Sequence, residues 1–415
     1  MEDVEVVIVG AGSAGLAAAK ILNAAGRSFH IVEALDRVGG RAWTTSERFG
    51  VPFDVGCAWL HAADRNPYFD DAKAAGWTLF HHDMGLDHLY FSTERASPEQ
   101  MAEVEAADAR LAAMIEGHTG EQDQLSTLIA EGHALRAATT FMGPMDFGQD
   151  DDEISIADFR AAADLDPNYF TKEGFGALVT LFGSGVPVHL SNPVKKIRWD
   201  TPGVSVETER GTIRARAVIV TASPAVLAFE EIQFAPQLPH DYVEAFYDLP
   251  MGMLTKIPVE ISGTRLGLKA FDDMLIERHA RHDIYFLCFP FELDLLVGFV
   301  GGDFAWEMEA AGEAAGVDFV IDRLAGIFGN DMRKHVGRSQ MTRWGGERYM
   351  RGAYAAARPG RALARAKLMQ PLADRIYFAG EHLAGPLIQT CGGARLSGEA
   401  VARDVIAMLD GERSG

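Results

Sequence analysis

The stretch that constrains the fold most lies within the first forty residues, where an apolar run, a glycine motif and a helical pattern follow one another. Residues 6–9 read Val-Val-Ile-Val, residues 10–15 read Gly-Ala-Gly-Ser-Ala-Gly, and the apolar residues of 16–22 recur with helical periodicity. This order predicts a strand, a tight turn and a helix. A chain that starts in this way is expected to form an α/β protein.

Each glycine of the motif has its own expected task. Gly10 permits the turn, Gly12 lets the backbone approach a pyrophosphate, and Gly15 lets the helix pack closely on the strand. A second expected strand, residues 29–32, ends in Glu33, where a carboxylate can bind an adenosine ribose 2′-hydroxyl. The pattern predicts dinucleotide binding; the alternative is a tight turn in another kind of α/β protein.

Residues 37–41, Arg-Val-Gly-Gly-Arg, follow this unit and extend the pattern. The whole stretch resembles the FAD-binding start of the flavin amine oxidase family, in which the second glycine pair and the arginine lie over the FAD pyrophosphate. The resemblance implies that Gly40 and Arg41 bind FAD. Taken alone, Arg37 and Arg41 would be read as surface charges.

The composition narrows the classes of partner. Lys and Arg number 38 against 59 Asp and Glu, so the net charge of −21 argues against a nucleic-acid partner and would attract a cation such as a polyamine.

Three distant cysteines, Cys57, Cys288 and Cys391, predict a reducing compartment without a disulfide framework. With the first strand expected from about Glu5, no signal peptide is predicted, and no apolar stretch is long enough to span a membrane. We therefore expect a cytoplasmic protein, and a homodimer is the assembly considered.

Residues 53–61 followed by Asn66-Pro67 resemble the segment that runs beneath the flavin in polyamine oxidases. The resemblance implies that Trp59 contacts FAD and that His61 lines the substrate channel as a tuned base. The alternative for His61 is a structural role.

From about residue 76 the pattern changes to helical stretches, with helices expected over 98–116 and 124–141, as in an insertion that covers a ligand site. The histidines and aspartates of residues 81–88 fit no standard zinc spacing, so no metal site is expected. Residues 204–208, 211–213 and 217–221 are expected to form strands of a small sheet.

Lys256 lies inside an apolar strand pattern, residues 252–260. A buried ammonium costs several kcal/mol unless a partner compensates it, so Lys256 is a site candidate on physical grounds. In flavin amine oxidases the matching lysine reaches the flavin N5 through a water, and the resemblance implies that role. The alternative is a structural lysine that extends to the surface.

The last part of the chain carries the family's Ala-Gly-Glu motif, ending at Glu381, and its Gly-Ala-x-x-Ser-Gly helix. The resemblance implies that Glu381 holds the ribityl and phosphate region and that the helix start at Gly393 and Ala394 faces the flavin ring. It also places Val194 beside the adenine and adds Trp344 to the FAD-binding set.

Two departures from the monoamine oxidases concern the site. Those enzymes enclose the amine between two tyrosines and attach FAD through a cysteine. Tyr354 matches one tyrosine, Thr390 replaces the other, and Ala353 stands in place of the cysteine. We therefore expect non-covalent FAD and only half of the tyrosine sandwich, with Tyr354 and Thr390 as catalytic-site residues, a pattern closer to polyamine oxidases.

These motifs predict an α/β, two-domain flavoprotein. A Rossmann-like FAD-binding domain of the GR2 type is expected from residues 1–75, 190–240 and 341–415, and a substrate domain with a mixed sheet and helices from 76–189 and 241–340.

The expected reaction is oxidation of a polyamine or another primary or secondary amine to the imine, with O2 reduced to H2O2. Activity should rise with pH, because a free amine is protonated at neutral pH. The alternatives are an L-amino-acid oxidase, a desaturase or porphyrinogen-type FAD oxidase acting on C–C bonds, and a flavin-binding protein without turnover.

Overall fold

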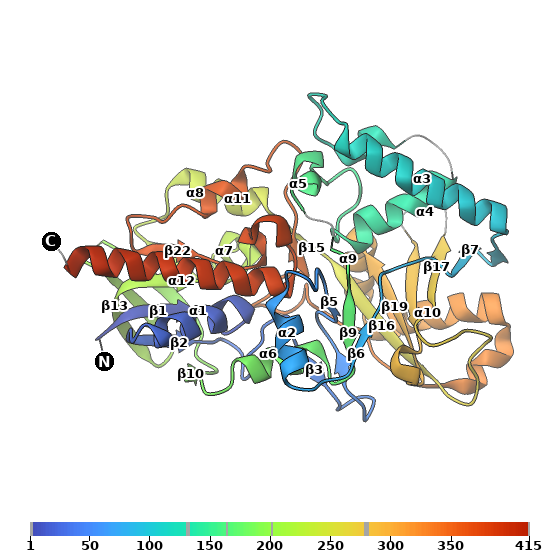
Figure 1. Ribbon diagram of the computed structural model, residues 1–415, viewed down its shortest axis with the longest axis horizontal. Helices are drawn as coiled ribbons and strands as arrows, with labels where there is room; N and C mark the ends of the chain where they lie inside the picture. Colours follow the sequence, from blue (N-terminus) through green and yellow to red (C-terminus); the bar gives the residue numbers. More distant parts are fainter. Residues whose placement is uncertain (1–2, 130–132, 163–164, 201, 278–281, 414–415) are drawn as a thin grey trace.

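We describe a computed structural model of the chain over residues 3–129, 133–162, 165–200, 202–277 and 282–413. Its strands and helices gather around two large sheets, on the left and the right of Figure 1. The mixed α/β architecture confirms the predicted fold class. In the described part of the chain, no helix has both the length and the apolar character that crossing a membrane requires.

The first sheet has eight strands, with β1 (Asp3–Val9) near its centre. Parallel neighbours flank β1 on both sides, β2 (Phe29–Val32) and β13 (Gly211–Val220). The glycine motif leads from β1 into α1 (Ser13–Ala24), as predicted. The remaining strands of this sheet are β10 (Val188–His189), β11 (Val194–Arg198), β12 (Val204–Thr208), β14 (Gln233–Ala235) and β22 (Ile376–Phe378).

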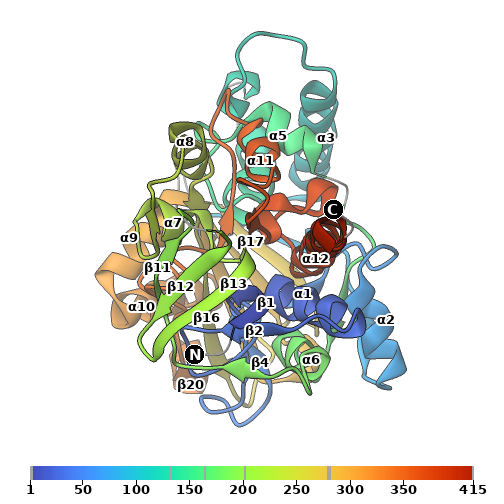
Figure 2. The same cartoon turned by 90° about the vertical axis from the view of Figure 1, so that its left-hand side faces the viewer.

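Both faces of this sheet are buried, which explains why β1 is apolar throughout. Val6 and Ile8 point to one face, where they join a cluster with Leu16 of α1, while Val7 and Val9 join a cluster on the other face. Helix α12 (Cys391–Arg413) lies along α1 on the first face (Figure 2). The opposite face carries α7 (Pro224–Ala228), α8 (His240–Asp248) and α11 (Ala364–Leu368).

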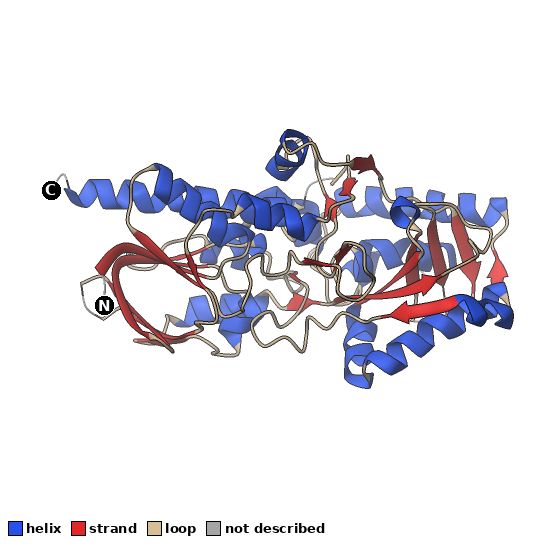
Figure 3. Cartoon of the chain, turned by 90° about the horizontal axis from the view of Figure 1, so that it is seen from below, coloured by secondary structure: helices blue, strands red, loops and turns tan. Residues whose placement is uncertain are grey.

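The second sheet has seven strands, with β16 (Leu254–Ile261) and β19 (Leu295–Gly301) paired antiparallel near one side. Helices lie on both of its faces (Figure 3). The other strands are β7 (His88–Phe91), β8 (Glu94–Arg95), β17 (Asp273–Glu277), β18 (Ile284–Cys288) and β20 (Val336–Ser339). Its helices are α3 (Pro98–Glu116), α4 (His133–Thr140), α9 (Gly302–Ala311) and α10 (Glu313–Phe328).

Three small sheets and several short helices lie outside the two large sheets. The small sheets pair β3 (Thr44–Thr45) with β4 (Phe53–Asp54), β15 (Met251–Gly252) with β21 (Tyr354–Ala355), and β9 (Tyr169–Thr171) with both β5 (Trp59–Leu60) and β6 (Leu79–His81). The short helices are α2 (Pro67–Ala74), α5 (Ile156–Ala161), α6 (Phe175–Phe182), η1 (Leu125–Leu128), η2 (Phe141–Met145), η3 (Pro290–Glu292), η4 (Asn330–His335), η5 (Glu381–Leu383) and η6 (Gly385–Leu387).

One of the two helices expected between residues 76 and 170 differs from the structure. Helix α3 has the predicted bounds, but the expected helix over 124–141 is wrong as one continuous element, and residues 130–132 within it lie outside the described residues. The N–H groups of Leu125 and Ser126 donate to carbonyls of residues 154 and 151 instead of continuing a helix. A long-range loop contact thus overrides the local helical pattern.

The two strands predicted over 211–213 and 217–221 are one strand, β13, and it belongs to the large first sheet. Arg214 and Arg216 are less buried than Ala215 and Ala217, so the alternation of a strand continues across the expected break.

The expected domain boundary also differs from the packing. Helix α6 and strand β10 fall within the predicted substrate segment 76–189, yet β10 pairs with β2 and α6 packs with the first sheet's core. The reason is the apolar face of α6, on which Leu178 and Val179 are fully buried. Helix α8, from the segment 241–340, packs on the first sheet as well. The division into two domains otherwise stays a prediction.

Candidate active site

A cavity of about 810 Å3 connects the glycine motif at the end of β1 with strands β16, β18 and β19 of the second sheet. It gathers the predicted site residues from all parts of the chain, with the exception of Gly15 and Gly393. The predicted residues that line it are Gly10, Gly12, Glu33, Gly40, Arg41, Trp59, His61, Val194, Lys256, Trp344, Tyr354, Glu381, Thr390 and Ala394.

The glycine motif forms one end of the cavity. Gly10 has a positive φ of 101°, and a Cβ on Gly12 would meet no atom closer than 3.9 Å, so the backbone there borders open space. A Cβ on Gly15 would lie 2.0 Å from the carbonyl oxygen of Gly10. Gly15 is therefore a packing residue, as expected. No side chain caps α1, so the N–H groups of its first turn are suited to a pyrophosphate.

Glu33 lies beside the motif and its carboxylate is held by backbone groups. Oε2 accepts from the N–H of Ala11 at 2.6 Å, and Oε1 accepts from the N–H of Leu35 at 2.8 Å. Burial raises the pKa of Glu33 above its usual value, and these two hydrogen bonds oppose that shift. The arrangement fixes a carboxylate where a ribose hydroxyl would fit.

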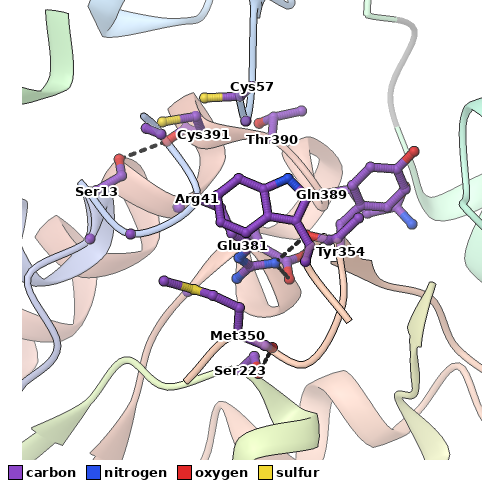
Figure 4. Close-up of a pocket in the computed structure, with 18 of the residues that line it drawn as sticks. Ser13, Arg41, Cys57, Ser223, Met350, Tyr354, Glu381, Gln389, Thr390 and Cys391 are labelled. Carbon is purple, nitrogen blue, oxygen red and sulfur yellow. Dashed lines mark hydrogen bonds and ion pairs between the residues drawn. The ribbon is translucent and has the colours of Figure 1, made fainter. Parts of the chain in front are cut away.

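Arg41 and Glu381 come from opposite ends of the chain and form an ion pair on the cavity wall, with Nη1 and Oε1 2.9 Å apart (Figure 4). Arg41 also donates to the carbonyl of Ala353 at 2.6 Å, and Glu381 accepts from the N–H of Ala355 at 3.2 Å. The pair therefore ties the second glycine loop to the segment that carries Tyr354.

Lys256 is buried, with 7% of its surface exposed, and it has the compensating partners that its position requires. Its Nζ donates to the carbonyl of Asp54 at 2.9 Å and to that of Gly56 at 2.5 Å. Burial lowers the pKa of Lys256 to about 8, although the charge of Asp54 acts in the opposite direction. A group with this pKa gains and loses a proton near neutral pH at little cost.

Tyr354 and Thr390 both line the cavity, but their hydroxyls are already engaged. Tyr354 donates to the carbonyl of Met145 at 2.6 Å, and burial raises its pKa well above the usual value. Thr390 donates to the carbonyl of Leu387 at 2.8 Å and accepts from the N–H of Gly393 at 2.9 Å. Thr390 thus caps the start of α12.

The Gly393 amide is consequently not available to a flavin, which differs from the expectation for this helix start. A Cβ on Gly393 would lie 2.0 Å from the carbonyl oxygen of Leu387, so this glycine serves close packing. Ala394, one residue later, does line the cavity.

His61 stacks on Trp59 with their rings nearly parallel, and its Nδ1 lies 2.7 Å from Oδ1 of Asn168. Since an amide oxygen only accepts, Nδ1 carries the proton and Nε2 is left as an acceptor. Burial lowers the pKa of His61, so the ring is neutral at neutral pH. Both the predicted role as a base and a structural role are compatible with this geometry.

The sequence reasoning missed Asp146, which follows η2 and lines the cavity near Tyr354. Within the described part of the chain, no hydrogen bond or ion pair reaches its carboxylate, and the surface it exposes borders the cavity. Burial, with the nearby charge of Asp108 on α3, raises the pKa of Asp146 to about 7. A lone aspartate in the apolar run Phe-Met-Gly-Pro-Met-Asp-Phe could have revealed it, by the logic applied to Lys256.

Known proteins are similar to the chain over nearly its whole length. The chain is 27% identical to polyamine oxidase 4 of Oryza sativa subsp. japonica over 96% of the chain and 87% of the relative. It is 28% identical to lysine-specific histone demethylase 1 homolog 1 of the same plant over 97% of the chain, but spans only about half, 52%, of that protein.

Two solved structures show the same fold. A putrescine oxidase bound to putrescine superposes with a TM-score of 0.82 at 22% identity, over 98% of this chain and 99% of that one. Cyclohexylamine oxidase from Brevibacterium oxydans gives 0.79 at 22% identity, over 99% and 100%. A model of the flavin-containing amine oxidoreductases matches residues 13–128 and 159–406. The chain therefore belongs to the flavin-containing amine oxidoreductase family.

Proposed function

We propose that the protein binds FAD without a covalent bond and oxidises a diamine or polyamine to the imine, with dioxygen as acceptor and hydrogen peroxide as product. The family supports flavin-dependent amine oxidation over the C–C oxidases considered above. An L-amino-acid substrate is disfavoured, because its carboxylate would enter a cavity that holds the unpaired Asp146. The cytoplasmic location and the homodimer remain predictions from the sequence.

The residues at the glycine end fit FAD. The α1 start would hold the pyrophosphate, Glu33 the ribose, and the Arg41–Glu381 pair the ribityl and phosphate region. When bound, FAD supplies the two-electron acceptor for the amine.

We expect FAD to separate from the protein on denaturation, because Ala353 offers no thiol for a covalent bond. Acid or heat precipitation should leave the yellow flavin in the supernatant, as measured by its absorbance. A precipitate that keeps the flavin after washing would contradict the proposal, and a free-FAD sample carried through the same steps serves as the control.

Three residues of the chain would handle protons and orientation. Lys256, held by two carbonyls and with a pKa of about 8, can pass a proton to or from a bound water. Neutral His61 offers Nε2 as an acceptor for a proton of the incoming ammonium. Tyr354, fixed by its bond to Met145, presents its ring as a wall of the cavity.

Asp146 is the single observation that carries the choice of a diamine or polyamine. The Asp146 carboxylate is exposed to the cavity and has no hydrogen-bond or ion-pair partner within the described residues, so a cationic group of the substrate can pair with it. A substrate with two amines brings such a cation, since one amine can be oxidised while the other stays protonated and binds the acid. Asp108 adds negative charge beside it, and the protein's net charge of −21 favours the approach of a polycation.

Asp146→Asn should therefore separate diamines from monoamines. For putrescine we expect KM to rise about tenfold to a hundredfold, the value of a hydrogen bond to a charged group, with little change in kcat. For n-butylamine, which lacks the second amine, KM should change by less than about twofold. Steady-state kinetics with both substrates measures the difference, and Asp404→Asn on the exposed face of α12 is the matched control.

The pH dependence gives a second readout of the same group. The carboxylate is the form that binds a cation, and it is populated above a pKa of about 7. The preference for putrescine over n-butylamine should thus rise with pH through about 7 in the wild type and stay flat in Asp146→Asn. Equal losses for both amines would remove Asp146 from substrate recognition while leaving amine oxidation itself intact.

A further inference from the structure

Cys57 and Cys391 are far apart in the sequence but meet at the cavity. Cys57 precedes β5, and Cys391 is the first residue of α12. Both line the cavity, and Figure 4 shows the two sulfurs near each other. We propose that Cys57 and Cys391 form a redox-active pair that hydrogen peroxide converts to an intramolecular disulfide.

The two thiols can be reached from the cavity, whereas the third cysteine cannot. Both Cys57 and Cys391 are partly exposed, and the surface around them belongs to the cavity. Cys288 is fully buried in the core of the second sheet. The chain therefore contains its own control for reactivity, because only the cavity pair should react with a small oxidant.

Hydrogen bonds anchor the backbone of both cysteines. The carbonyl of Cys391 accepts from Ser13 Oγ at 2.8 Å, and the N–H of Cys57 donates to the carbonyl of Arg41 at 3.2 Å. Both segments are thus anchored with their sulfurs near each other, so the bond would form by movement of the two side chains between fixed segments.

The chemistry is a two-electron oxidation of the pair. One thiolate attacks a peroxide oxygen to give a sulfenic acid and hydroxide, which becomes water with the released proton. The second thiol then displaces a second water as the S–S bond forms. Peroxide is reduced to two waters and the two thiols are oxidised. Burial and the neighbouring thiol raise the pKa of Cys57, so oxidation should be faster at higher pH.

The disulfide would join two walls of the cavity. Cys57 lies on the segment whose Gly56 carbonyl holds Lys256, and Cys391 lies at the start of α12. Since both walls border the space that FAD would occupy, the oxidised protein should release FAD more slowly than the reduced one.

The test uses the purified full chain, reduced and then treated with hydrogen peroxide. Titration after denaturation should find the number of free thiols fall from three to one. Mass spectrometry should find a loss of two hydrogen atoms and a peptide that joins the two cysteines. Dithiothreitol should restore both thiols, and Cys288→Ser should keep the cross-link. Cys57→Ala and Cys391→Ala should each abolish it.

Unchanged thiols, or added oxygen on either cysteine without a cross-link, would overturn the proposal. Only the source of the peroxide rests on the proposed function, since the pair's chemistry is tested with added peroxide and does not need turnover. In the active enzyme, the cross-link should accumulate during amine turnover and catalase should slow it. Accumulation that is indifferent to catalase would show that the enzyme's own peroxide is not the oxidant.

Discussion

Replacing Lys256 by Met should slow flavin reduction by amine, or its reoxidation by oxygen, by about a hundredfold or more, the range that general acid–base catalysis contributes. The ammonium group is buried at the cavity and held by the carbonyls of Asp54 and Gly56. A methionine has similar volume but can neither donate to these carbonyls nor exchange a proton. FAD should stay bound, because the residues expected to hold its ribose and phosphates, Glu33, Arg41 and Glu381, are unchanged.

Stopped-flow absorbance measures the two half-reactions separately, under anaerobic conditions for reduction and with oxygen for reoxidation. Lys195→Met, on the exposed side of β11, is the matched control and should be near the wild type. The loss of two hydrogen bonds also destabilises the variant by an amount on the order of 1–3 kcal/mol, so unfolding is measured alongside. Near-normal rates in a folded, FAD-bound variant would remove Lys256 from the chemistry.

Lys256 and Asp146 together show which site residues a sequence can reveal. Both are charged residues set among apolar ones, but Lys256 is buried within its strand, whereas Asp146 exposes its carboxylate to the cavity. Lys256 was predicted because the apolar strand pattern of residues 252–260 indicated its burial, and the strand that holds it, β16, spans Leu254–Ile261. Asp146 follows a short π-helical turn, where no periodicity indicates what faces inward.

The structure around the glycine motif could also be predicted from a sequence pattern. The strand, turn and helix around the glycine motif depend on residues close in sequence, and β1, α1 and β2 have the predicted order. The engagement of Gly393 by Thr390 was not predicted, because a resemblance assigns positions to a cofactor without showing which backbone groups are already bonded. Cys57 and Cys391 come to the cavity from opposite ends of the chain, and no spacing rule reaches that far.

Removing the carboxylate of Asp158 should cause the largest loss of stability. Arg365 donates to both oxygens of Asp158, at 2.6 and 2.7 Å, and both residues are buried. The same guanidinium donates to the carbonyls of His382 at 2.8 Å and Ala355 at 3.0 Å, so it cannot turn to solvent when its partner is lost. Asp158→Ala should lower the free energy of unfolding by about 3–5 kcal/mol, the cost of an uncompensated buried charge.

Urea unfolding of the FAD-free protein, followed by fluorescence, measures this difference without a contribution from cofactor binding. Glu207→Ala, which breaks the exposed ion pair with Arg198, is the control and should cost less than about 1 kcal/mol. The double variant Asp158→Leu with Arg365→Met removes both charges and should recover much of the loss. A double variant no more stable than Asp158→Ala would mean that the hydrogen bonds to His382 and Ala355, rather than the ion pair, hold α5 and α11 against the cavity wall.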